Sequence, residues 1–405
     1  MRRRGGYAEN FSHRFGGTDQ LPPKQPGVHR LWLQAVSVGE MLAIAPLLEA
    51  FKREGGTEVY LTTTTSTGYK LAKEKYGALT IGIGYFPLDF WAFSARAWRE
   101  VQPDLCVLME GERWPEHVHQ AKARGVAVIC VNARLSDRTF RRSMKFRRLL
   151  EPLSDGLSQI LCSSKRDEQR FKALGFPAQR LETTGNLKLD VQIPLMSEEE
   201  RTALRCELGL SDGLVLLGSS TWSGEEAALV TAWQEARAGG LKVSLLLVPR
   251  HAERREALRA ELEKLGCTFH FRSAGKAPAV VDVAVGDTTG ELRKFTQLAD
   301  VVFVGKSLAP HEGGQTPVEA AVLGKPILHG PHMTNFREII RTLTEVGAVR
   351  KVETLEELVR GAEELLRDPT QREKLADASR RWHEVNRGAT ERTLAVIRTR
   401  LALLG

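Results

Sequence analysis

The sequence predicts an α/β protein built from two doubly wound, Rossmann-like domains. Short apolar runs alternate with stretches of helical spacing, and the runs are apolar at successive positions. Strands of that kind are buried on both faces, as in a parallel sheet that is covered by helices on both sides. The alternation breaks near residues 180–200, at a turn and a proline, and then restarts. A chain of 405 residues also favours two domains over one.

The expected elements follow one another in pairs along the chain. Residues 1–28 are basic and then rich in glycine and proline, which indicates an irregular approach segment. In the first half, the expected strands are residues 30–38, 58–65, 104–111, 126–133 and 159–164, and the expected helices are residues 40–56, 66–77, 115–124, 139–153 and 166–174. In the second half, the expected strands are residues 213–221, 242–250, 280–287, 301–304 and 326–328, with helices from Gly224, from Ala252, through Leu298, over Thr316–Leu323 and over most of 355–401. We therefore expect domains at residues 29–185 and 186–370, followed by a helical segment at 371–405.

The composition limits which partners and which kinds of binding site can be expected. A net charge of +8 and a pI near 9.3 favour an anionic partner, such as nucleic acid, a nucleotide or an acidic membrane surface. The five cysteines are dispersed without a CxxC pair, which is typical of reduced core cysteines. His117 with His119, and His329 with His332, lack a cysteine or carboxylate at ligand spacing, so no metal site is expected. No secretory signal and no apolar run of membrane-spanning length is present in the sequence.

Three charged residues of the first half are candidates for catalysis. Glu40 opens an expected helix after a strand, where a carboxylate can act as a general base. The helix dipole would lower its pKa unless burial offsets that effect, and a carboxylate that only stabilises the helix start is the favoured explanation from spacing alone. Glu110 follows another apolar strand, together with Glu112, which could instead pair with Arg113. Lys188 could reach an anion from the linker or be a solvated linker lysine.

Candidate nucleotide-binding loops follow several expected strands of the second half. Residues 301–331 combine a strand, a glycine-bearing loop and a helix whose start would suit an anionic group, with Glu319 near enough to accept hydrogen bonds from sugar hydroxyls. An ordinary βα turn is the alternative. Arg250 could pair with a phosphate, and the loops at 219–221 and 286–291 end neighbouring strands. Several such loops from one sheet edge are stronger support than any one of them.

A run of basic residues follows the expected strand at 126–133. Its members are opposed only by Asp137, and they are Arg134, Arg138, Arg141, Arg142, Lys145, Arg147 and Arg148. Such a run could bind a phosphorylated lipid or nucleic acid, while a solvated helix face is the usual alternative. Because balancing acids are nearly missing, a binding function is modestly favoured.

Ordered motifs identify a family resemblance that covers about residues 29–350. The chain resembles the 3-deoxy-D-manno-octulosonate (Kdo) transferases of lipopolysaccharide biosynthesis, glycosyltransferase family 30. The similar motifs are SVGE (37–40), LTTTTSTG (61–68), MEGERWP (109–115), NARLS (132–136), GNLKLD (185–190), VPRHAER (248–254), VGDTTGEL (285–292), FVGKSL (303–308), GGQTPVEAA (313–321) and GPHMTNF (330–336). The resemblance implies a GT-B fold with an interdomain cleft, an acceptor-binding first domain, a CMP-sugar-binding second domain and a C-terminal helix that returns to the first domain.

The resemblance also implies a reaction and a role for each candidate residue. Kdo would pass from CMP-Kdo to a lipid A precursor, lipid IVA, with inversion and without a cofactor or metal. Glu40 matches the family's proton acceptor, and Glu110 and Lys188 match positions that stabilise the transition state. The expected CMP contacts are Pro249, Arg250, Thr289, Gly290, Glu291, Thr316, Pro317, Val318 and Glu319, and the acceptor-binding candidates are Arg134, Arg138, Arg141 and Arg142.

Three residues and the chain start depart from the family pattern. The family commonly has Asn at Thr316, Thr at Gly111 and a second Gly at Lys306, and its members commonly begin with an apolar anchor. We expect a peripheral protein on the cytoplasmic face of a bacterial inner membrane, held by its basic face, or a chain whose start has been trimmed. The alternatives are a GT-B enzyme with another nucleotide-sugar, such as an epimerase, or a non-catalytic homologue. A nucleic-acid binder would explain the charge but not the ordered loops, so no nucleic acid partner is expected.

Overall fold

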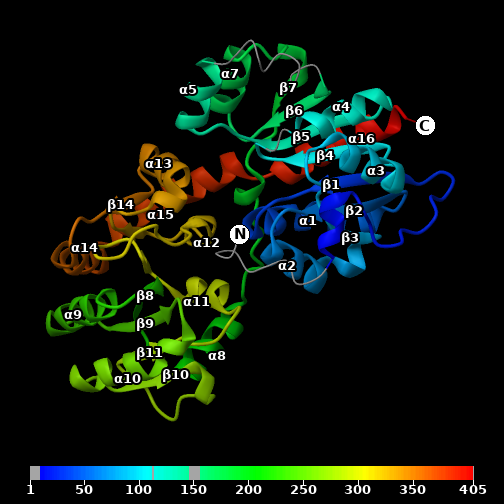
Figure 1. The fold of residues 1–405 in the computed structure, drawn as a ribbon. Helices are drawn as coiled ribbons and strands as arrows, with labels where there is room; N and C mark the ends of the chain where they lie inside the picture. The colour runs from blue at the N-terminus through cyan, green and yellow to red at the C-terminus, as the bar shows by residue number, and fades with distance from the viewer. Residues whose placement is uncertain (1–9, 112–113, 146–155, 405) are drawn as a thin grey trace. The chain divides into compact units, whose positions relative to one another are not determined.

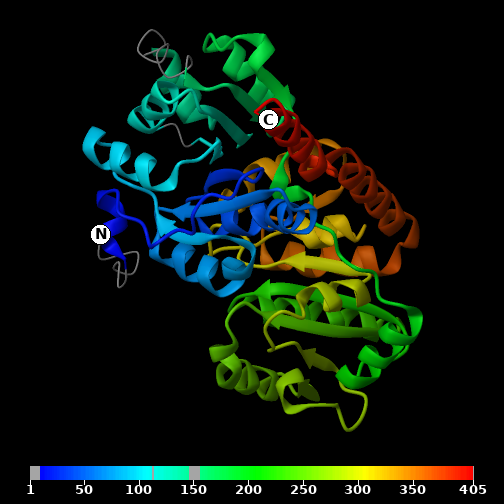
Figure 2. The same cartoon turned by 90° about the vertical axis from the view of Figure 1, so that its right-hand side faces the viewer.

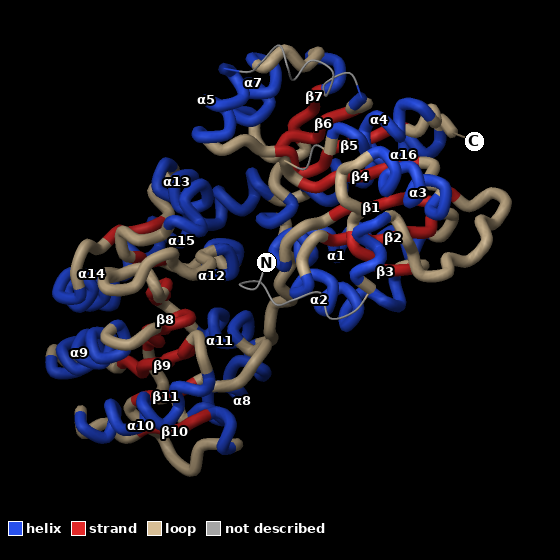
Figure 3. Tube along the Cα trace, viewed as in Figure 1, coloured by secondary structure: helices blue, strands red, loops and turns tan. Residues whose placement is uncertain are grey.

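The computed structural model describes residues 10–111, 114–145 and 156–404, and these form two compact units. The first unit comprises residues 1–190 with 386–405, and the second comprises residues 191–385. Each contains one seven-stranded sheet in which every paired strand is parallel. Figures 1 and 3 show the strands of each unit lying among its helices. The predicted α/β class with two doubly wound sheets is therefore confirmed.

The first sheet has the strand order β3-β2-β1-β4-β5-β6-β7. Its direction of growth reverses between β1 and β4, which makes that pair the topological switch point, where ligands of such sheets usually bind. The elements of this unit are β1 (His29–Gln34), α1 (Val38–Glu54), β2 (Thr57–Thr63), α2 (Ser66–Tyr76), β3 (Gly82–Tyr85), α3 (Trp91–Val101), β4 (Leu105–Met109), α4 (Pro115–Ala123), β5 (Ala127–Ala133), α5 (Asp137–Lys145), β6 (Gln159–Cys162), α7 (Lys165–Ala173), β7 (Leu181–Thr183) and α16 (Ala389–Ala402).

The second sheet has the order β10-β11-β9-β8-β12-β13-β14, and its switch point lies between β8 and β12. Its elements are α8 (Glu198–Leu208), β8 (Leu214–Thr221), α9 (Glu225–Ala238), β9 (Val243–Pro249), α10 (Arg255–Lys264), β10 (Phe269–Phe271), β11 (Val283–Val285), α11 (Leu292–Leu298), β12 (Val301–Val304), α12 (Val318–Val322), β13 (Ile327–His329), α13 (Arg337–Glu345), β14 (Val349–Lys351), α14 (Leu355–Arg367) and α15 (Pro369–Asn386).

Strand β1 shows why the central strands are apolar at successive positions. Leu31 and Leu33 belong to a core cluster that includes residues of α1, α2 and α16, whereas Trp32 belongs to a second cluster with residues of α3, α4 and α7. Side chains alternate between the two faces of a sheet, so a strand covered on both faces must be apolar throughout. Figure 2 shows the helices around each sheet from the side.

The boundary between the units differs from the expected one at residues 185 and 186. Leu187 is 3% exposed and packs in the first unit's core, so the chain leaves that unit only after Asp190. The expected helical segment 371–405 is two helices rather than one. Helix α15 belongs to the second unit up to Val385, while α16 packs Leu394 and Ile397 into the first unit's core.

Two expected helices have different bounds in the structure. The expected helix over Thr316–Leu323 is the short α12, and Pro317 lies at its N-cap position. The expected helix 139–153 is α5 as far as Lys145, and residues 146–155 lie outside the described residues. Strand β1 ends earlier than expected, at Gln34, because the Ser37 side chain accepts a hydrogen bond from Glu40 N and caps α1.

Asp190 should contribute measurably to stability because it caps α16 from a distant part of the chain. Its carboxylate accepts hydrogen bonds from Gly388 N at 2.8 Å and Thr390 N at 2.6 Å. We expect Asp190→Ala to lower the free energy of unfolding by about 1–2 kcal/mol, the usual contribution of a helix cap. Urea denaturation measures this, and Asp212→Ala in an exposed turn is the control. An unchanged midpoint for Asp190→Ala would show that the cap contributes nothing.

Candidate functional site

Glu40 lies in the first turn of α1, at the switch point of the first sheet. Its side chain is buried, with 7% exposed. One carboxylate oxygen accepts a hydrogen bond from Val36 N at 2.8 Å, and the other accepts one from Ser37 Oγ at 2.9 Å. Burial raises the pKa of Glu40 above its ordinary value, and these hydrogen bonds only partly offset the effect. The effect of burial on the pKa of Glu40 is therefore larger than that of the hydrogen bonds at the helix start, and the raised pKa suits Glu40 to accept a proton.

Glu110 follows β4, the neighbour of β1, and carries two cationic partners. One oxygen accepts from Lys188 Nζ at 2.5 Å and the other from Arg134 Nε at 3.0 Å. The backbone of Glu110 has φ 55°, a left-handed conformation that a residue with a side chain rarely adopts. Such strain persists where the surrounding contacts fix it, which is frequent at functional sites. The prediction that Glu110 and Lys188 belong to one site is consistent with this contact, and their roles stay a prediction.

Lys188 is positioned by the chain on either side of it. Asn186 Oδ1 accepts a hydrogen bond from Lys188 N at 3.0 Å, and Asn132 Oδ1 accepts one from Leu187 N at 3.0 Å. A Cβ built on Gly39 would lie 3.9 Å from Lys188 Nζ, so the ammonium lies close to the start of α1. Lys188 is thus a held side chain of the first unit and not a solvated linker lysine.

Asn132 is a site residue that the sequence reasoning did not single out. It is fully buried, has φ 52° and is the next-to-last residue of β5, the strand next to β4. Its Nδ2 has no hydrogen-bond partner within the described part of the chain. Two sequence signals point to it: the NARLS motif begins at Asn132, and an asparagine inside the apolar run 126–133 is out of place in a buried strand unless its amide is used.

The charges of this site act on one another. The charge of Glu110 raises the pKa of Glu40 further, whereas the charge of Lys188 lowers it. The arrangement therefore places a proton acceptor beside a coupled carboxylate and ammonium pair. It can deprotonate a hydroxyl and can stabilise charge that develops nearby.

The structure separates the four candidate arginines into two groups. Arg134 belongs to the Glu110 site, while Arg138, Arg141 and Arg142 are exposed on α5. Asp137 at the start of α5 is paired instead with Arg166, at 3.0 Å, and with Arg170. Arg147, Arg148 and Glu112 lie outside the described residues.

The candidate loops of the second unit follow β9, β11 and β12. Pro249 ends β9 and is buried, and Arg250 is exposed with its N–H bonded to Thr221 O at 3.1 Å. Thr289 and Gly290 are exposed at the turn into α11, and Gly290 has φ 90°. These loops stand at the carboxyl edge of one sheet, as expected, but no bound group tests their role.

The two acidic candidates of the second unit have protein partners. Glu291 accepts hydrogen bonds from Arg272 Nε at 3.3 Å and from Thr288. Burial raises the pKa of Glu291, but these two partners outweigh that effect and hold it below its ordinary value. Glu319 accepts from Thr316 Oγ1 at 3.3 Å, and the same hydroxyl accepts from Val318 N at 3.2 Å. Thr316 therefore organises the start of α12, although it departs from the family pattern.

Glu225, in the first turn of α9, is a second residue that the sequence reasoning missed. It is 1% exposed and accepts hydrogen bonds from four main-chain N–H groups, those of Trp222, Lys306, Ser307 and Leu308. The carboxylate thus fixes the loop after β12 to the loop after β8. Consequently, these four N–H groups are occupied by Glu225. The anion site expected within residues 301–331 lies further along the chain, at the start of α12, and it stays a prediction.

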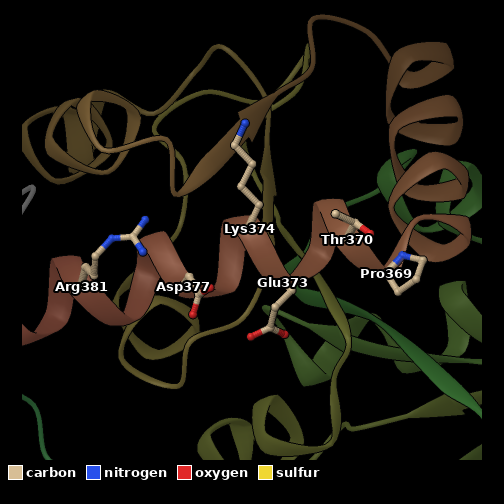
Figure 4. Close-up of a pocket in the computed structure, with 6 residues that line it drawn as sticks. All are labelled: Pro369, Thr370, Glu373, Lys374, Asp377 and Arg381. Atoms are coloured by element: carbon tan, nitrogen blue, oxygen red, sulfur yellow. The ribbon is translucent and has the colours of Figure 1, made fainter.

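Other possible sites are few in the described part of the chain. A hollow of about 720 Å³ is lined by residues of α15 alone, none of which is a predicted site residue. Figure 4 shows these residues, which are Pro369, Thr370, Glu373, Lys374, Asp377 and Arg381. Within the described ranges, no group of three metal-ligating side chains occurs, and no helix has the length and hydropathy to cross a membrane.

Known proteins resemble this chain over nearly its full length. The family model for 3-deoxy-D-manno-octulosonic-acid transferase (kdotransferase) matches residues 9–191. The 3-deoxy-D-manno-octulosonic acid transferase of Haemophilus influenzae is 33% identical over 97% of this chain and 91% of its own length, and that of Bordetella pertussis is 34% identical over 97% and 92%. The solved UDP-GlcNAc 2-epimerase from Neisseria meningitidis has a TM-score of 0.59 at 14% identity, over 92% of this chain and 99% of its own, which shows a shared fold.

The raised pKa of Glu40 predicts a pH dependence of stability. A carboxylate whose pKa is higher in the folded than in the unfolded protein favours folding only while it is protonated in the fold. This contribution is complete below the unfolded value near 4.5 and is lost as the pH rises through the folded value. Glu40→Gln should therefore gain stability relative to the parent protein between pH 4.5 and pH 7.5.

Urea denaturation across this pH range measures the effect. Glu49→Gln, on the exposed side of the same helix, is the matched control. A difference between Glu40→Gln and the parent that stays constant with pH would contradict the raised pKa.

Proposed function

The chain belongs to the 3-deoxy-D-manno-octulosonic-acid transferase family, and from that premise we propose that it transfers Kdo from CMP-Kdo to the lipid A precursor lipid IVA, with inversion. The observation that carries the proposal is the buried Glu40, with a raised pKa, beside the Glu110–Lys188 ion pair. Relatives of that name match almost the whole chain, so the proposal covers both units.

Glu40 is the proposed general base. An acceptor hydroxyl oxygen attacks the anomeric carbon of Kdo, and its proton passes to the Glu40 carboxylate. The bond from the anomeric carbon to the phosphate oxygen breaks, and CMP departs with the electron pair. A raised pKa brings the base nearer to the working pH, which favours proton transfer. The Val36 N–H and the Ser37 hydroxyl hold the carboxylate in one orientation.

Glu110 and Lys188 are the proposed stabilisers of the transition state. Positive charge develops at the anomeric centre while negative charge develops on the departing CMP. A carboxylate and an ammonium fixed against each other present both signs of charge without reorganising during the reaction. Arg134 and Asn132 hold this pair in place from neighbouring positions, through Glu110 and through Leu187.

The loops of the second unit are the proposed CMP site. Arg250 is exposed and has no carboxylate partner within the described ranges, so its guanidinium is available to the phosphate. The remaining proposed contacts are Pro249, Thr289, Gly290, Glu291, Thr316, Pro317, Val318 and Glu319. Glu291 and Glu319 are half-buried acceptors that suit hydroxyl groups of the donor.

The basic face of α5 is the proposed contact with lipid phosphates at the inner membrane. Arg138, Arg141 and Arg142 are exposed there, next to Met144, which is 41% exposed. Cations near an anionic surface gain about 1 kcal/mol each. We therefore propose a peripheral protein on the cytoplasmic face, with α5 beside the phosphates of the membrane or of the lipid acceptor.

The transfer reaction is tested by incubating the protein with CMP-Kdo and lipid IVA and measuring CMP release and lipid mass. The parent protein should add Kdo. Glu40→Gln should lower the rate by about 10²–10⁴-fold, the usual contribution of a general base, while CMP binding by the second unit stays unchanged.

Three outcomes would count against this reaction or against the role of Glu40. Failure of the parent protein to add Kdo would reject the transferase proposal, and a UDP-sugar as the preferred donor would favour another GT-B activity. A Glu40→Gln variant with near-normal turnover would remove Glu40 as the base. Glu49→Gln on the same helix should transfer Kdo normally.

The membrane proposal predicts weaker binding after charge reversal on α5. Arg141→Glu with Arg142→Glu should lower binding to phosphatidylglycerol-containing vesicles by at least about tenfold, because two attractive charges become repulsive. Lys52→Glu with Arg53→Glu on α1 reverses the same charge at exposed positions and is the control. Equal loss in both pairs would mean that binding reflects net charge and not α5.

A further inference from the structure

The switch point of the second sheet brings Trp222 and Lys306 together. Trp222 follows β8 and Lys306 follows β12, and these two strands are neighbours. The corresponding switch point of the first sheet, between β1 and β4, holds Glu40 and Glu110. Sheets of this kind bind ligands at the carboxyl ends of the strands where the order reverses. The donor contacts proposed above include neither Trp222 nor Lys306.

The two loops are fixed to each other by one buried oxygen. Glu225 Oε2 accepts hydrogen bonds from Trp222 N and from Lys306 N, each at 2.9 Å. Gly305 approaches so closely that a Cβ there would lie 2.5 Å from Ser220 O. The backbone positions of Trp222 and Lys306 are therefore set before any ligand binds.

Lys306 has a backbone conformation that a glycine would adopt more easily. Its φ is 59°, in the left-handed region that side chains disfavour. This explains why a glycine at this position, the family's common residue, is compatible with the same loop. A lysine in such a conformation adds a cation at the switch point that a glycine would not supply.

The Lys306 ammonium lies over the Trp222 ring, with Nζ 4.8 Å from the ring centroid. His251 and His311 flank the same ring, each with its centroid 5.2 Å away. No carboxylate of the described residues pairs with Lys306 or with Arg250, which precedes His251. The ring holds the ammonium by a cation–π contact, and the remaining N–H donors of the ammonium are left for an acceptor.

We propose that Lys306 is an additional donor-binding residue, whose ammonium on the Trp222 ring binds an anionic group of the CMP-sugar. This rests on the proposed transferase function. The donor offers two such groups, the phosphate of CMP and the carboxylate of the octulosonic acid. The N–H groups of Lys306, Ser307 and Leu308 are already bonded to Glu225. The loop after β12 therefore recognises an anion through the Lys306 side chain and not through its backbone.

Lys306→Gly and Lys306→Arg test the proposal. The glycine variant removes the cation and relieves the left-handed backbone, so it is expected to fold, whereas the arginine variant keeps the cation. Calorimetry gives the dissociation constants for CMP and for cytidine, and the transfer assay gives KM for CMP-Kdo. Lys264→Ala, an exposed lysine of α10, is the matched control.

The binding and transfer measurements together show whether Lys306 binds the phosphate or the sugar carboxylate. If Lys306 binds the phosphate, Lys306→Gly should weaken CMP binding by about tenfold and leave cytidine binding unchanged. If it binds the sugar carboxylate, CMP affinity should stay unchanged while KM for CMP-Kdo rises by about tenfold. Lys306→Arg should stay within a few-fold of the parent protein in either case.

The opposing outcomes are also distinct. A glycine variant that binds CMP and uses CMP-Kdo like the parent protein would overturn the role of Lys306 and leave the transferase function intact. A parent protein that neither binds CMP nor transfers Kdo would overturn both.

Discussion

In both units, a buried carboxylate accepts hydrogen bonds from the loop that follows a central strand, and the arrangement of the strand ends depends on these bonds. In each unit a Gly-Glu pair opens the helix after the strand at the switch point, Gly39-Glu40 after β1 and Gly224-Glu225 after β8. The chain must turn sharply at these strand ends, and its N–H groups must find partners away from the ladder. Glu225 uses its two oxygens on four main-chain N–H groups, whereas Glu40 accepts one N–H and one hydroxyl. Burial raises the pKa of both carboxylates. They differ in their partners, because Glu225 accepts four main-chain hydrogen bonds and Glu40 accepts only one.

Backbone strain marks the same strand ends. Glu110 and Asn132 lie at the carboxyl ends of the neighbouring strands β4 and β5, Glu110 just after its strand and Asn132 one residue before the end. Ser220 near the end of β8 and Lys306 after β12 lie at another pair of neighbouring strands. All four have positive φ, which costs on the order of 1–3 kcal/mol for each residue with a side chain. The tight contacts around Glu225 and around Leu187 hold these conformations. At Asn132 and Lys306, hydrogen bonds to Leu187 N and to the buried Glu225 help to hold the strained backbone.

The sequence predicts the centre of each sheet better than its edges. Central strands are covered on both faces, so they are continuous apolar runs that can be recognised in the sequence. The four strands that were not predicted, β3, β7, β10 and β14, are the outer strands of the two sheets and are only three or four residues long. Charged residues after apolar runs identified Glu40 and Glu110, but Glu225 was missed because its partner Lys306 lies 81 residues further along the chain. Local patterns do not contain such a contact.

Residues 185–190 contact both the candidate active site and α16, the C-terminal helix that packs in the first unit. Asn132 holds Leu187 within the first unit, and Lys188 in the same turn reaches Glu110. Two residues later, Asp190 caps α16, whose buried face completes the first unit's core. This segment has the turn-like sequence of a linker, yet its contacts belong to the site and to the core. Through Asp190, a helix from the far end of the chain is hydrogen-bonded to the same short segment that carries Lys188.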